Sequence, residues 1–140
     1  MVVGGPADDS SGMPSAAALK VFLADDSPAI RSRVAGLLAA DTLRIVGEAG
    51  TPQACIDGIL ATHPDVVVLD VQLDGGQGLE VLHAVRGAAP DVAFVVFSNN
   101  AGPAYRKRYL AAGAVSFLDK SAEFDRLAGA VSAALHPHCT

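Results

Sequence analysis

The stretch that decides the fold is VVVLDVQL, which runs from Val66 to Leu73. Its four consecutive apolar residues are typical of a strand that is buried on both faces. The run ends at Asp70, although an ionised carboxylate that leaves water is costly unless a hydrogen bond or an opposite charge compensates it. Asp70 therefore either solvates the end of a strand or belongs to a site that uses its carboxylate in a reaction.

Segments of strand length and of helix length alternate on both sides of this stretch. The five expected strands are residues 19–25, 44–50, 66–70, 92–98 and 115–120, and the five expected helices are residues 28–40, 51–63, 78–87, 102–113 and 123–135. Strict alternation indicates parallel strands joined by right-handed crossovers, with helices on both faces of the sheet. The sequence therefore predicts an α/β fold with a doubly wound, five-stranded parallel sheet.

Local signals for helix starts support this alternation. Pro28 follows Ser27 at the expected start of the first helix, where proline fits the first turn and serine can cap it. Ser121 stands before the last expected helix, and Glu123 and Asp125 place negative charge in its first turn. We therefore expect these two helices to begin at residues 28 and 123.

Length and composition limit the number of domains. The chain has 140 residues, of which 51% are hydrophobic and 18% are charged, so it has room for one domain with its own core. Residues 1–18 are rich in Gly, Ser, Pro and Asp, which predicts a disordered tail. Residues 19–135 form the expected domain, and residues 136–140 form a short C-terminal tail.

Charge, cysteine content and the lack of long apolar runs indicate where the protein works. The net charge of −5 argues against a nucleic-acid-binding surface, and the only basic cluster is Arg106–Arg108. Cys55 and Cys139 form no disulfide framework and suit a reducing compartment. No apolar run approaches the ~18 residues of a membrane-spanning helix, and the N-terminus lacks a signal-peptide pattern. We therefore expect a cytoplasmic protein that binds neither membranes nor DNA.

Polar residues follow four of the five expected strands. Asp25 and Asp26 follow the first strand, Asp70 the third, Ser98 ends the fourth and Lys120 the fifth. With the flavodoxin-like strand order 2-1-3-4-5, the first and third strands are neighbours, so the aspartates converge at the carboxyl edge of the sheet. Two carboxylates about 4 Å apart repel each other by roughly 4 kcal/mol at an effective dielectric of about 20, so the cluster needs a proton or a cation. Mg²⁺, which prefers oxygen ligands, is the expected cofactor.

Four segments resemble the receiver domain of bacterial response regulators, and the resemblance spans about residues 19–135. LADDSPAIR (23–31) is similar to the strand with the acidic pair, and LDVQL (69–73) is similar to the phosphoacceptor strand. VVFSNN (95–100) is similar to the strand with the switch hydroxyl, and SFLDK (116–120) to the strand with the terminal lysine. Each motif alone is weak, but their order and spacing make the resemblance specific. The residues of these motifs are most similar to those of receivers that often carry a helix-turn-helix output domain. This sequence lacks such a domain, so we expect a stand-alone receiver.

The resemblance implies a role for each residue of the acidic cluster. Asp70 resembles the aspartate that accepts a phosphoryl group from a histidine kinase or a histidine phosphotransfer protein. Asp26 resembles the direct Mg²⁺ ligand and Asp25 the ligand that acts through water, while Gln72 resembles the residue whose backbone carbonyl binds the metal. Lys120 resembles the lysine that pairs with the phosphoryl oxygens. The chain is then a signalling switch and not an enzyme, although it assists its own phosphorylation and dephosphorylation.

The resemblance also implies how the signal leaves the site. Ser98 is expected to move toward the phosphoryl group, and Phe117, at the family's aromatic switch position, to turn into the vacated space. The face formed by the fourth helix, the fifth strand and the fifth helix would then change its affinity for a downstream protein or for a second copy of the chain. Arg106–Arg108 lies on this fourth helix.

Two departures from the family pattern and three alternatives accompany this interpretation. Asp74 replaces a common proline and begins a stretch, DGGQG, that we expect to be flexible, and Ser121 replaces the proline that often follows the lysine.

A phosphatase of the haloacid dehalogenase type needs a second aspartate where Gln72 stands, and a flavodoxin needs loop aromatics that are not found. A degenerate receiver that only binds protein partners is the third alternative, and phosphorylation separates it from an active receiver.

Overall fold

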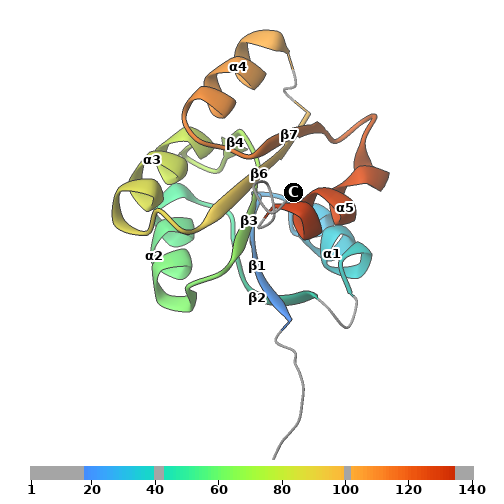
Figure 1. The fold of residues 1–140 in the computed structure, drawn as a ribbon, viewed down its shortest axis with the longest axis horizontal. Helices are drawn as coiled ribbons and strands as arrows, with labels where there is room; N and C mark the ends of the chain where they lie inside the picture. Colours follow the sequence, from blue (N-terminus) through green and yellow to red (C-terminus); the bar gives the residue numbers. More distant parts are fainter. Residues whose placement is uncertain (1–17, 40–42, 100–101, 135–140) are drawn as a thin grey trace, which may run out of the picture.

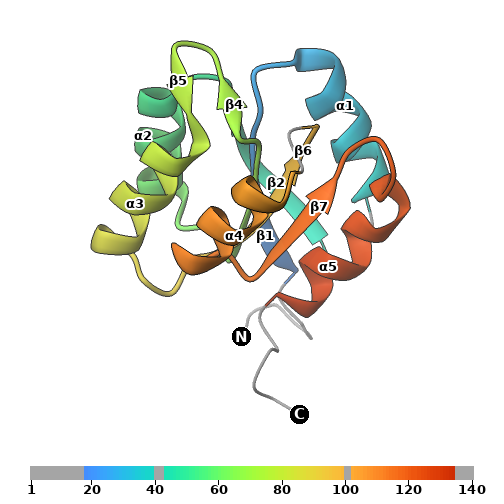
Figure 2. The same ribbon diagram turned by 90° about the horizontal axis from the view of Figure 1, so that it is seen from above.

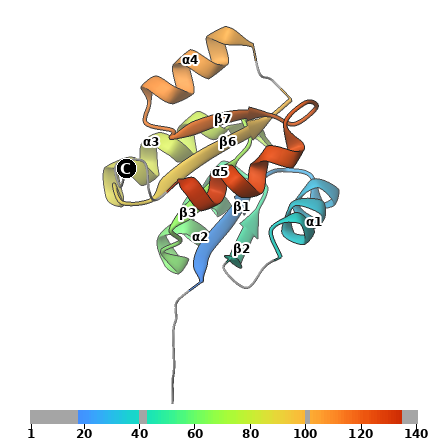
Figure 3. The same ribbon diagram turned by 45° about the vertical axis from the view of Figure 1, so that its right-hand side comes forward.

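The structure is a computed structural model that describes residues 18–39, 43–99 and 102–134. Five parallel strands form one sheet in the order β2-β1-β3-β6-β7, and Figure 3 shows them side by side. Counted along the strands of this sheet alone, the order is 2-1-3-4-5, so the predicted fold class is confirmed. The expected tails lie outside the described residues, apart from residue 18, and the domain limits stay a prediction.

The elements follow the expected alternation of strands and helices. The strands of the sheet are β1 (Leu19–Ala24), β2 (Leu43–Ala49), β3 (Val66–Leu69), β6 (Ala93–Ser98) and β7 (Ser116–Asp119). The helices are α1 (Pro28–Leu37), α2 (Pro52–Thr62), α3 (Gly78–Ala88), α4 (Pro103–Ala111) and α5 (Leu127–Ala133). Within the described ranges, no helix has the combination of length and apolar character that crossing a bilayer requires.

Helices cover both faces of the sheet. α1 and α5 lie on one side, and α2 and α3 lie on the other, with α4 beside the edge strand β7 (Figure 1 and Figure 2). The side chains of β3 alternate between these layers. Val66 and Val68 join the core cluster that α1 and α5 cover, whereas Val67 and Leu69 join the cluster that α2 and α3 cover. All four are buried, which explains why this strand is an unbroken apolar run.

The ring of Phe22 on β1 lies against two glycines on neighbouring elements. A Cβ atom on Gly47 of β2 would come within 2.8 Å of a ring carbon, and a Cβ atom on Gly58 of α2 would come within 2.7 Å. Packed atoms do not approach this closely, so both positions need glycine while the ring keeps its place. The two glycines therefore let α2 pack close to β1 and β2.

Two helices begin at the carboxyl edge of the sheet with a capped first turn. Ser27 Oγ accepts a hydrogen bond from the Ile30 N–H (3.2 Å), and Pro28 is the first residue of α1, as the sequence predicts. Thr51 Oγ1 accepts in the same way from the Ala54 N–H (3.2 Å) at the start of α2. These caps fix where the chain turns after β1 and after β2.

Between β3 and α3 the structure has a short hairpin that the sequence analysis did not predict. β4 (Gln72–Leu73) and β5 (Gly76–Gln77) pair in antiparallel fashion around Asp74 and Gly75. Gly75 has a φ of 84°, which glycine adopts without strain, and the Asp74 N–H donates to the Gly50 carbonyl (2.9 Å). The stretch that was expected to be flexible is therefore held by backbone hydrogen bonds.

The last helix begins later than the sequence predicts. Phe124–Arg126 form a 3₁₀ helix, η2, and α5 begins at Leu127. Ser121 caps no helix, because its N–H (2.8 Å) and its hydroxyl (2.6 Å) both donate to Asp119 Oδ1. Glu123 lies before the helical turns and accepts from the Asp119 N–H (3.1 Å). The predicted cap at Ser121 is wrong because the Asp119 side chain closes a turn there, and the predicted helix start at residue 123 is too early.

Candidate functional site

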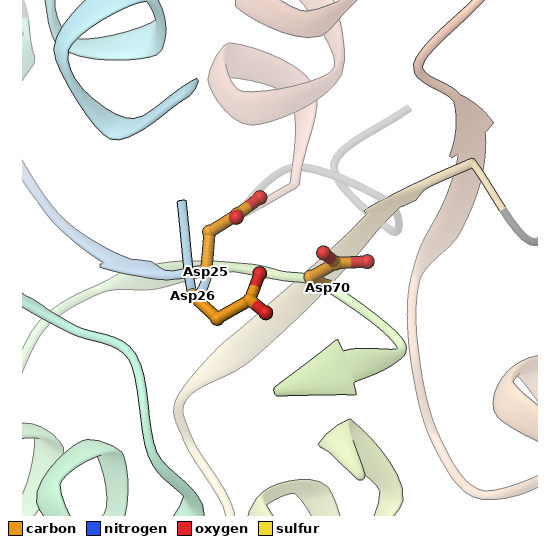
Figure 4. Close-up of side chains that lie close together, drawn as sticks. All are labelled: Asp25, Asp26 and Asp70. Carbon is orange, nitrogen blue, oxygen red and sulfur yellow. The ribbon is translucent and has the colours of Figure 1, made fainter. Parts of the chain in front are cut away.

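Three carboxylates meet at the carboxyl edge of the sheet. Asp25 and Asp26 follow β1 and Asp70 follows β3, and these strands are neighbours with Ala24 opposite Leu69. One oxygen of each aspartate lies within 4.8 Å of the other two, and Figure 4 shows the three side chains gathered there. Asp25 and Asp70 are each 7% exposed, whereas Asp26 is exposed. The predicted convergence of the acidic residues is therefore what the structure shows.

Backbone hydrogen bonds place the two buried aspartates. The Asp25 N–H donates to the Ala49 carbonyl (3.0 Å) and the Asp70 N–H donates to the Ala24 carbonyl (2.9 Å), so the sheet ladder continues one residue beyond each strand. Asp25 Oδ1 also accepts from the Ser27 N–H (2.9 Å). Both carboxylates are thus held on a rigid backbone, which is where a reactive group is placed most accurately.

Lys120 supplies the positive charge of the site. Its Nζ donates to Asp25 Oδ2 (2.5 Å) and to Asp70 Oδ2 (3.0 Å), and its side chain is 7% exposed. Burial alone lowers the pKa of Lys120, but the hydrogen bonds and charges of Asp25 and Asp70 outweigh burial and hold this pKa above its ordinary value. Lys120 is therefore a charged internal partner for both buried carboxylates.

The turn after β7 sets the position of this lysine. The Lys120 N–H donates to the Ser98 carbonyl (3.1 Å), which ties the end of β7 to the end of β6. Asp119 Oδ1 accepts both hydrogen bonds from Ser121, and these bonds lower the pKa of Asp119. Ser121, which departs from the family pattern, thus helps to close the turn that presents Lys120.

A cavity of about 320 Å³ opens above the carboxylates. It is lined by Asp25, Asp26, Ser27, Ile30, Asp70, Gln72, Ser98, Asn99 and Lys120. The Ser98 side chain is fully buried, and the Gln72 N–H lies 3.5 Å from Asp70 Oδ1. Six of the seven predicted site residues therefore lie at one cavity.

The donor set fits a hard divalent cation. All the clustered donors are carboxylate oxygens, and three carboxylates opposed by the single ammonium of Lys120 leave a net charge of −2 (−3 plus +1) when all are ionised. Mg²⁺ prefers such oxygen ligands and keeps several waters, for which the cavity has room. Asp74, in the hairpin beside the site, is not part of the acidic cluster.

Phe117 lies away from the cavity, in the core. It is 2% exposed, and its ring packs edge to face against Tyr109 of α4, with ring centroids 6.0 Å apart. The Arg106 guanidinium lies over the Phe117 ring, 5.3 Å from its centroid, and Arg106 Nη1 donates to the Phe117 carbonyl (3.0 Å). The switch role of Phe117 stays a prediction.

Arg31 is a site residue that the sequence analysis missed. Its Nη1 donates to the backbone carbonyl of Asp25 (2.6 Å) and its Nε donates to Glu48 Oε1 at the end of β2 (3.0 Å). It therefore fixes the loop that carries the acidic pair. The signal was present in DDSPAIR, because Arg31 stands one helical turn after the cap residue Ser27 and so points back toward the loop.

Comparison with known proteins agrees with this geometry. Residues 21–132 match the response regulator receiver domain family. The DNA-binding transcriptional activator DevR/DosR of Mycobacterium tuberculosis is 34% identical over 114 residues, which is 81% of this chain and 52% of that protein. The response regulator GacA of Pseudomonas aeruginosa is 29% identical over 81% of this chain and 53% of that protein. The chain thus spans about half the length of these curated relatives.

Solved structures give the same result for the fold. The signal receiver domain of NarL from Mycobacterium tuberculosis superposes with a TM-score of 0.80 at 30% identity, covering 86% of this chain and 98% of that domain. The likeness thus extends over a whole receiver domain. The family match covers most of the chain and includes all or most of every strand of the sheet. The chain therefore belongs to the response regulator receiver domains, which are signalling modules of two-component systems.

Proposed function

We propose that this chain is a phosphoacceptor receiver in which Asp70 takes a phosphoryl group from a histidine kinase or a histidine phosphotransfer protein. The observation that carries the proposal is the position of the Asp70 carboxylate. It is buried at the end of β3, 3.0 Å from Lys120 Nζ, and shares a cavity with the acidic pair. A carboxylate held in this way is poised to attack an anionic donor whose charge is neutralised nearby.

Each residue of the site has a role in this reaction. Asp26, Asp70 and the Gln72 carbonyl would hold Mg²⁺, with Asp25 acting through water. The ion, when bound, neutralises charge on the transferring group and on the carboxylates. A carboxylate oxygen of Asp70 forms the new bond to phosphorus, and the phosphorus bond to the donor imidazole nitrogen breaks, with its electron pair leaving on the nitrogen. Lys120 pairs with a phosphoryl oxygen, since its ammonium already lies 3.0 Å from Asp70.

The output of the reaction is a changed protein-binding surface. The Ser98 hydroxyl would bond a phosphoryl oxygen, and Phe117 would move in response, which alters the face formed by α4, β7 and α5. Tyr105, Leu110 and Val115 expose apolar surface on this face, with 39%, 40% and 42% of each residue accessible. Such residues suit contact with a downstream protein or with a second copy of the chain.

The test is mass spectrometry after incubation with acetyl phosphate and Mg²⁺. We expect the mass of one phosphoryl group, lost in Asp70→Asn and in EDTA, and retained in Asp74→Asn, which changes an exposed aspartate four residues away. Acetate is the leaving group in this assay, so no partner protein is needed. A wild-type protein that stays unlabelled would overturn the proposal and favour the degenerate receiver that only binds partners.

A further inference from the structure

α4 is anchored to the rest of the molecule by one buried side chain. Tyr109 is 1% exposed, and every other residue of Pro103–Ala111 is exposed. Its ring joins the core cluster that contains Phe117. The position of this helix on the sheet therefore depends on where the Tyr109 side chain can be held, together with the hydrogen bond from Arg106 to the Phe117 carbonyl.

The Tyr109 hydroxyl makes a bond to a different helix. It accepts a hydrogen bond from the Leu79 N–H (2.9 Å). Leu79 is the second residue of α3, and the first N–H groups of a helix have no partner within the helix. Burial, and to a lesser degree the charge of Asp70, raise the pKa of Tyr109 to about 12, so the hydroxyl is neutral at physiological pH. A buried tyrosine of α4 thus satisfies the start of α3.

The start of α3 rests directly on the phosphoacceptor residue. A Cβ atom on Gly78 would lie 2.1 Å from the Asp70 carbonyl oxygen, so the two backbones are in contact. The Gly78 N–H also donates to the Val71 carbonyl (2.7 Å). A displacement of the backbone at Asp70 is therefore passed to Gly78 and Leu79, since well-packed groups do not yield independently.

Two sets of contacts run from the site to the hydrogen bond between Tyr109 and Leu79. The first starts at Asp70 and ends at the beginning of α3. The second starts at Ser98 on β6, passes to the paired strand β7, and reaches α4 through the contact of the Phe117 and Tyr109 rings. The cavity lies where both sets of contacts begin, because Asp70 and Ser98 line it. The bond between Tyr109 and Leu79 joins them at their far ends, and Figure 2 shows α3 and α4 on the same side of the sheet.

We propose that the Tyr109 hydroxyl is a latch that holds α4 in its resting position and is released when the Asp70 pocket is filled. The inference rests on the proposed function, because it assumes that a phosphoryl group moves Asp70, Ser98 or both. N–H···O bonds span only about 2.7–3.2 Å, so a relative shift of the two helices by about 1 Å breaks the latch. Tyr109 is thus a positioning residue, which sets how far α4 responds.

The latch has a thermodynamic consequence that can be measured. A bond present in the resting state and absent in the filled state opposes filling, and removing it raises the affinity of the pocket by the same factor. For one neutral hydrogen bond this factor is roughly three- to tenfold. Tyr109→Phe removes the bond and keeps the ring against Phe117.

The experiment titrates beryllofluoride with Mg²⁺, as a phosphoryl mimic, into wild type, Tyr109→Phe and the control Tyr105→Phe. The control makes the same chemical change at an exposed tyrosine of α4. We expect Tyr109→Phe to bind beryllofluoride about three- to tenfold more tightly, with α4 amide resonances shifted part of the way to their filled positions before ligand is added. Equal affinities and unshifted α4 resonances in Tyr109→Phe would overturn the latch.

A second measurement uses the unmodified protein, and so does not depend on the variant. Hydrogen exchange at the Leu79 amide should be slow in the resting protein and faster once beryllofluoride is bound. Unchanged Leu79 exchange, with α4 resonances that move, would overturn the latch while leaving the proposed function intact. Failure of acetyl phosphate to label wild-type Asp70 would instead overturn the proposed function, and the latch that rests on it.

Discussion

Among the single residues, Lys120 determines the state of the site before any ligand binds. Its ammonium contacts both buried carboxylates, so Asp25 and Asp70 already share a positive charge. A divalent cation that enters the cavity must therefore compete with an internal cation for the same oxygens. The affinity of the site for Mg²⁺ is then a balance between these two positive charges.

Replacing this lysine with a neutral side chain should separate stability from metal affinity. Without metal, Lys120→Met leaves Asp25 and Asp70 without their buried partner, and we expect the free energy of unfolding to fall by about 3–5 kcal/mol. Mg²⁺ should restore more stability to this variant than to wild type, because no ammonium competes for the carboxylates. Urea unfolding with and without Mg²⁺ measures both effects. Lys107→Met, at an exposed lysine, should change neither, and equal Mg²⁺ stabilisation in all three proteins would contradict the expectation.

Gly78 links the packing of α3 to the proposed reaction at Asp70, because its backbone contacts the Asp70 carbonyl. A methyl group there would lie 2.1 Å from the Asp70 carbonyl, so Gly78→Ala forces the start of α3 away from the site. We expect this overpacking to lower the free energy of unfolding by about 1–3 kcal/mol and to slow the labelling of Asp70 by acetyl phosphate.

The matched control is on the same helix. A Cβ atom on Gly87 would meet nothing within 4 Å, and Gly87→Ala should raise the free energy of unfolding by about 0.5–1 kcal/mol because alanine is the better helix former. Normal Asp70 labelling in Gly78→Ala would show that the contact has no bearing on the reaction.

The residues that could be predicted from sequence are those placed by the ends of strands. Asp25 and Asp70 follow apolar runs directly and Lys120 follows one after a single residue, so the strand order brings the three together. Arg31 contacts the Asp25 carbonyl six residues earlier, and the DDSPAIR stretch carries a local signal for that contact. Tyr109 instead contacts the Leu79 N–H on another helix, and no local pattern encodes this contact because the partner is chosen by tertiary packing.

Among the elements, α4 and β7 are joined by a polar clamp, the side chain of Arg106. Arg106 of α4 donates to the Phe117 carbonyl (3.0 Å), lies over the Phe117 ring and approaches Glu123 Oε1 (3.8 Å) in the loop before η2. One side chain of α4 thus contacts both a strand and a loop of the proposed binding face. The basic cluster Arg106–Arg108 therefore contains one residue, Arg106, that also holds α4 against its neighbours.

Removing this clamp should loosen the face without unfolding the sheet. We expect Arg106→Met to lower the free energy of unfolding by about 1–2 kcal/mol, mostly through the charged hydrogen bond to the Phe117 carbonyl, because an exposed ion pair contributes little. Aromatic NMR should show faster flipping of the Phe117 ring. Arg108→Met, at an exposed arginine on the same helix, is the control, and identical ring dynamics in all three proteins would count against the clamp.

Among the elements, the periodicity of apolar residues predicted where strands and helices lie. Competition between side chains for hydrogen-bond partners could not be predicted from the sequence. The strands and the first four helices lie where the alternation predicts them. The hairpin at residues 72–77 was missed because its strands have two residues each, too few to show a period. The start of α5 was misplaced because Asp119 competes for Ser121, and a sequence cannot show which of two partners a side chain takes.

For the whole molecule, three buried groups make stability depend on alkaline pH. Burial raises the pKa of Cys55 from 9.0 to about 12 and that of Tyr109 from 10.0 to about 12. The pKa of Lys120 is raised as well, because Asp25 and Asp70 outweigh burial. Each group holds its proton more tightly in the folded state, so stability is fully present below the unfolded pKa and is lost as pH rises toward the folded pKa.

We therefore expect the free energy of unfolding to fall steadily above about pH 9, the ordinary pKa of the thiol that ionises first. Each ionising group contributes a slope of at most about 1.4 kcal/mol per pH unit. Urea unfolding at a series of pH values measures this slope. Cys55→Ala should flatten the curve between about pH 9 and about pH 10, and an unchanged slope in that variant would contradict the assignment.

The charge distribution of the whole molecule also bears on DNA binding. A relative such as DevR/DosR is named as DNA-binding, but this chain matches only 52% of it. The net charge is −5, and in the one basic cluster Arg106 is already engaged with Phe117 and Glu123. We expect the 140-residue chain to bind duplex DNA no better than a generic acidic protein, with or without beryllofluoride. Fluorescence anisotropy at low and physiological salt tests this, and salt-sensitive micromolar binding would contradict it.

The contact of Phe22 with two glycines restricts how this chain can evolve. A larger residue at Gly47 or Gly58 would strike the ring, while a smaller residue at Phe22 alone would leave a void between β1 and α2. Each single substitution is therefore harmful in the background of the other two residues. The three positions therefore evolve together. A larger residue can replace Gly47 or Gly58 only after Phe22 has been replaced by a residue without the ring.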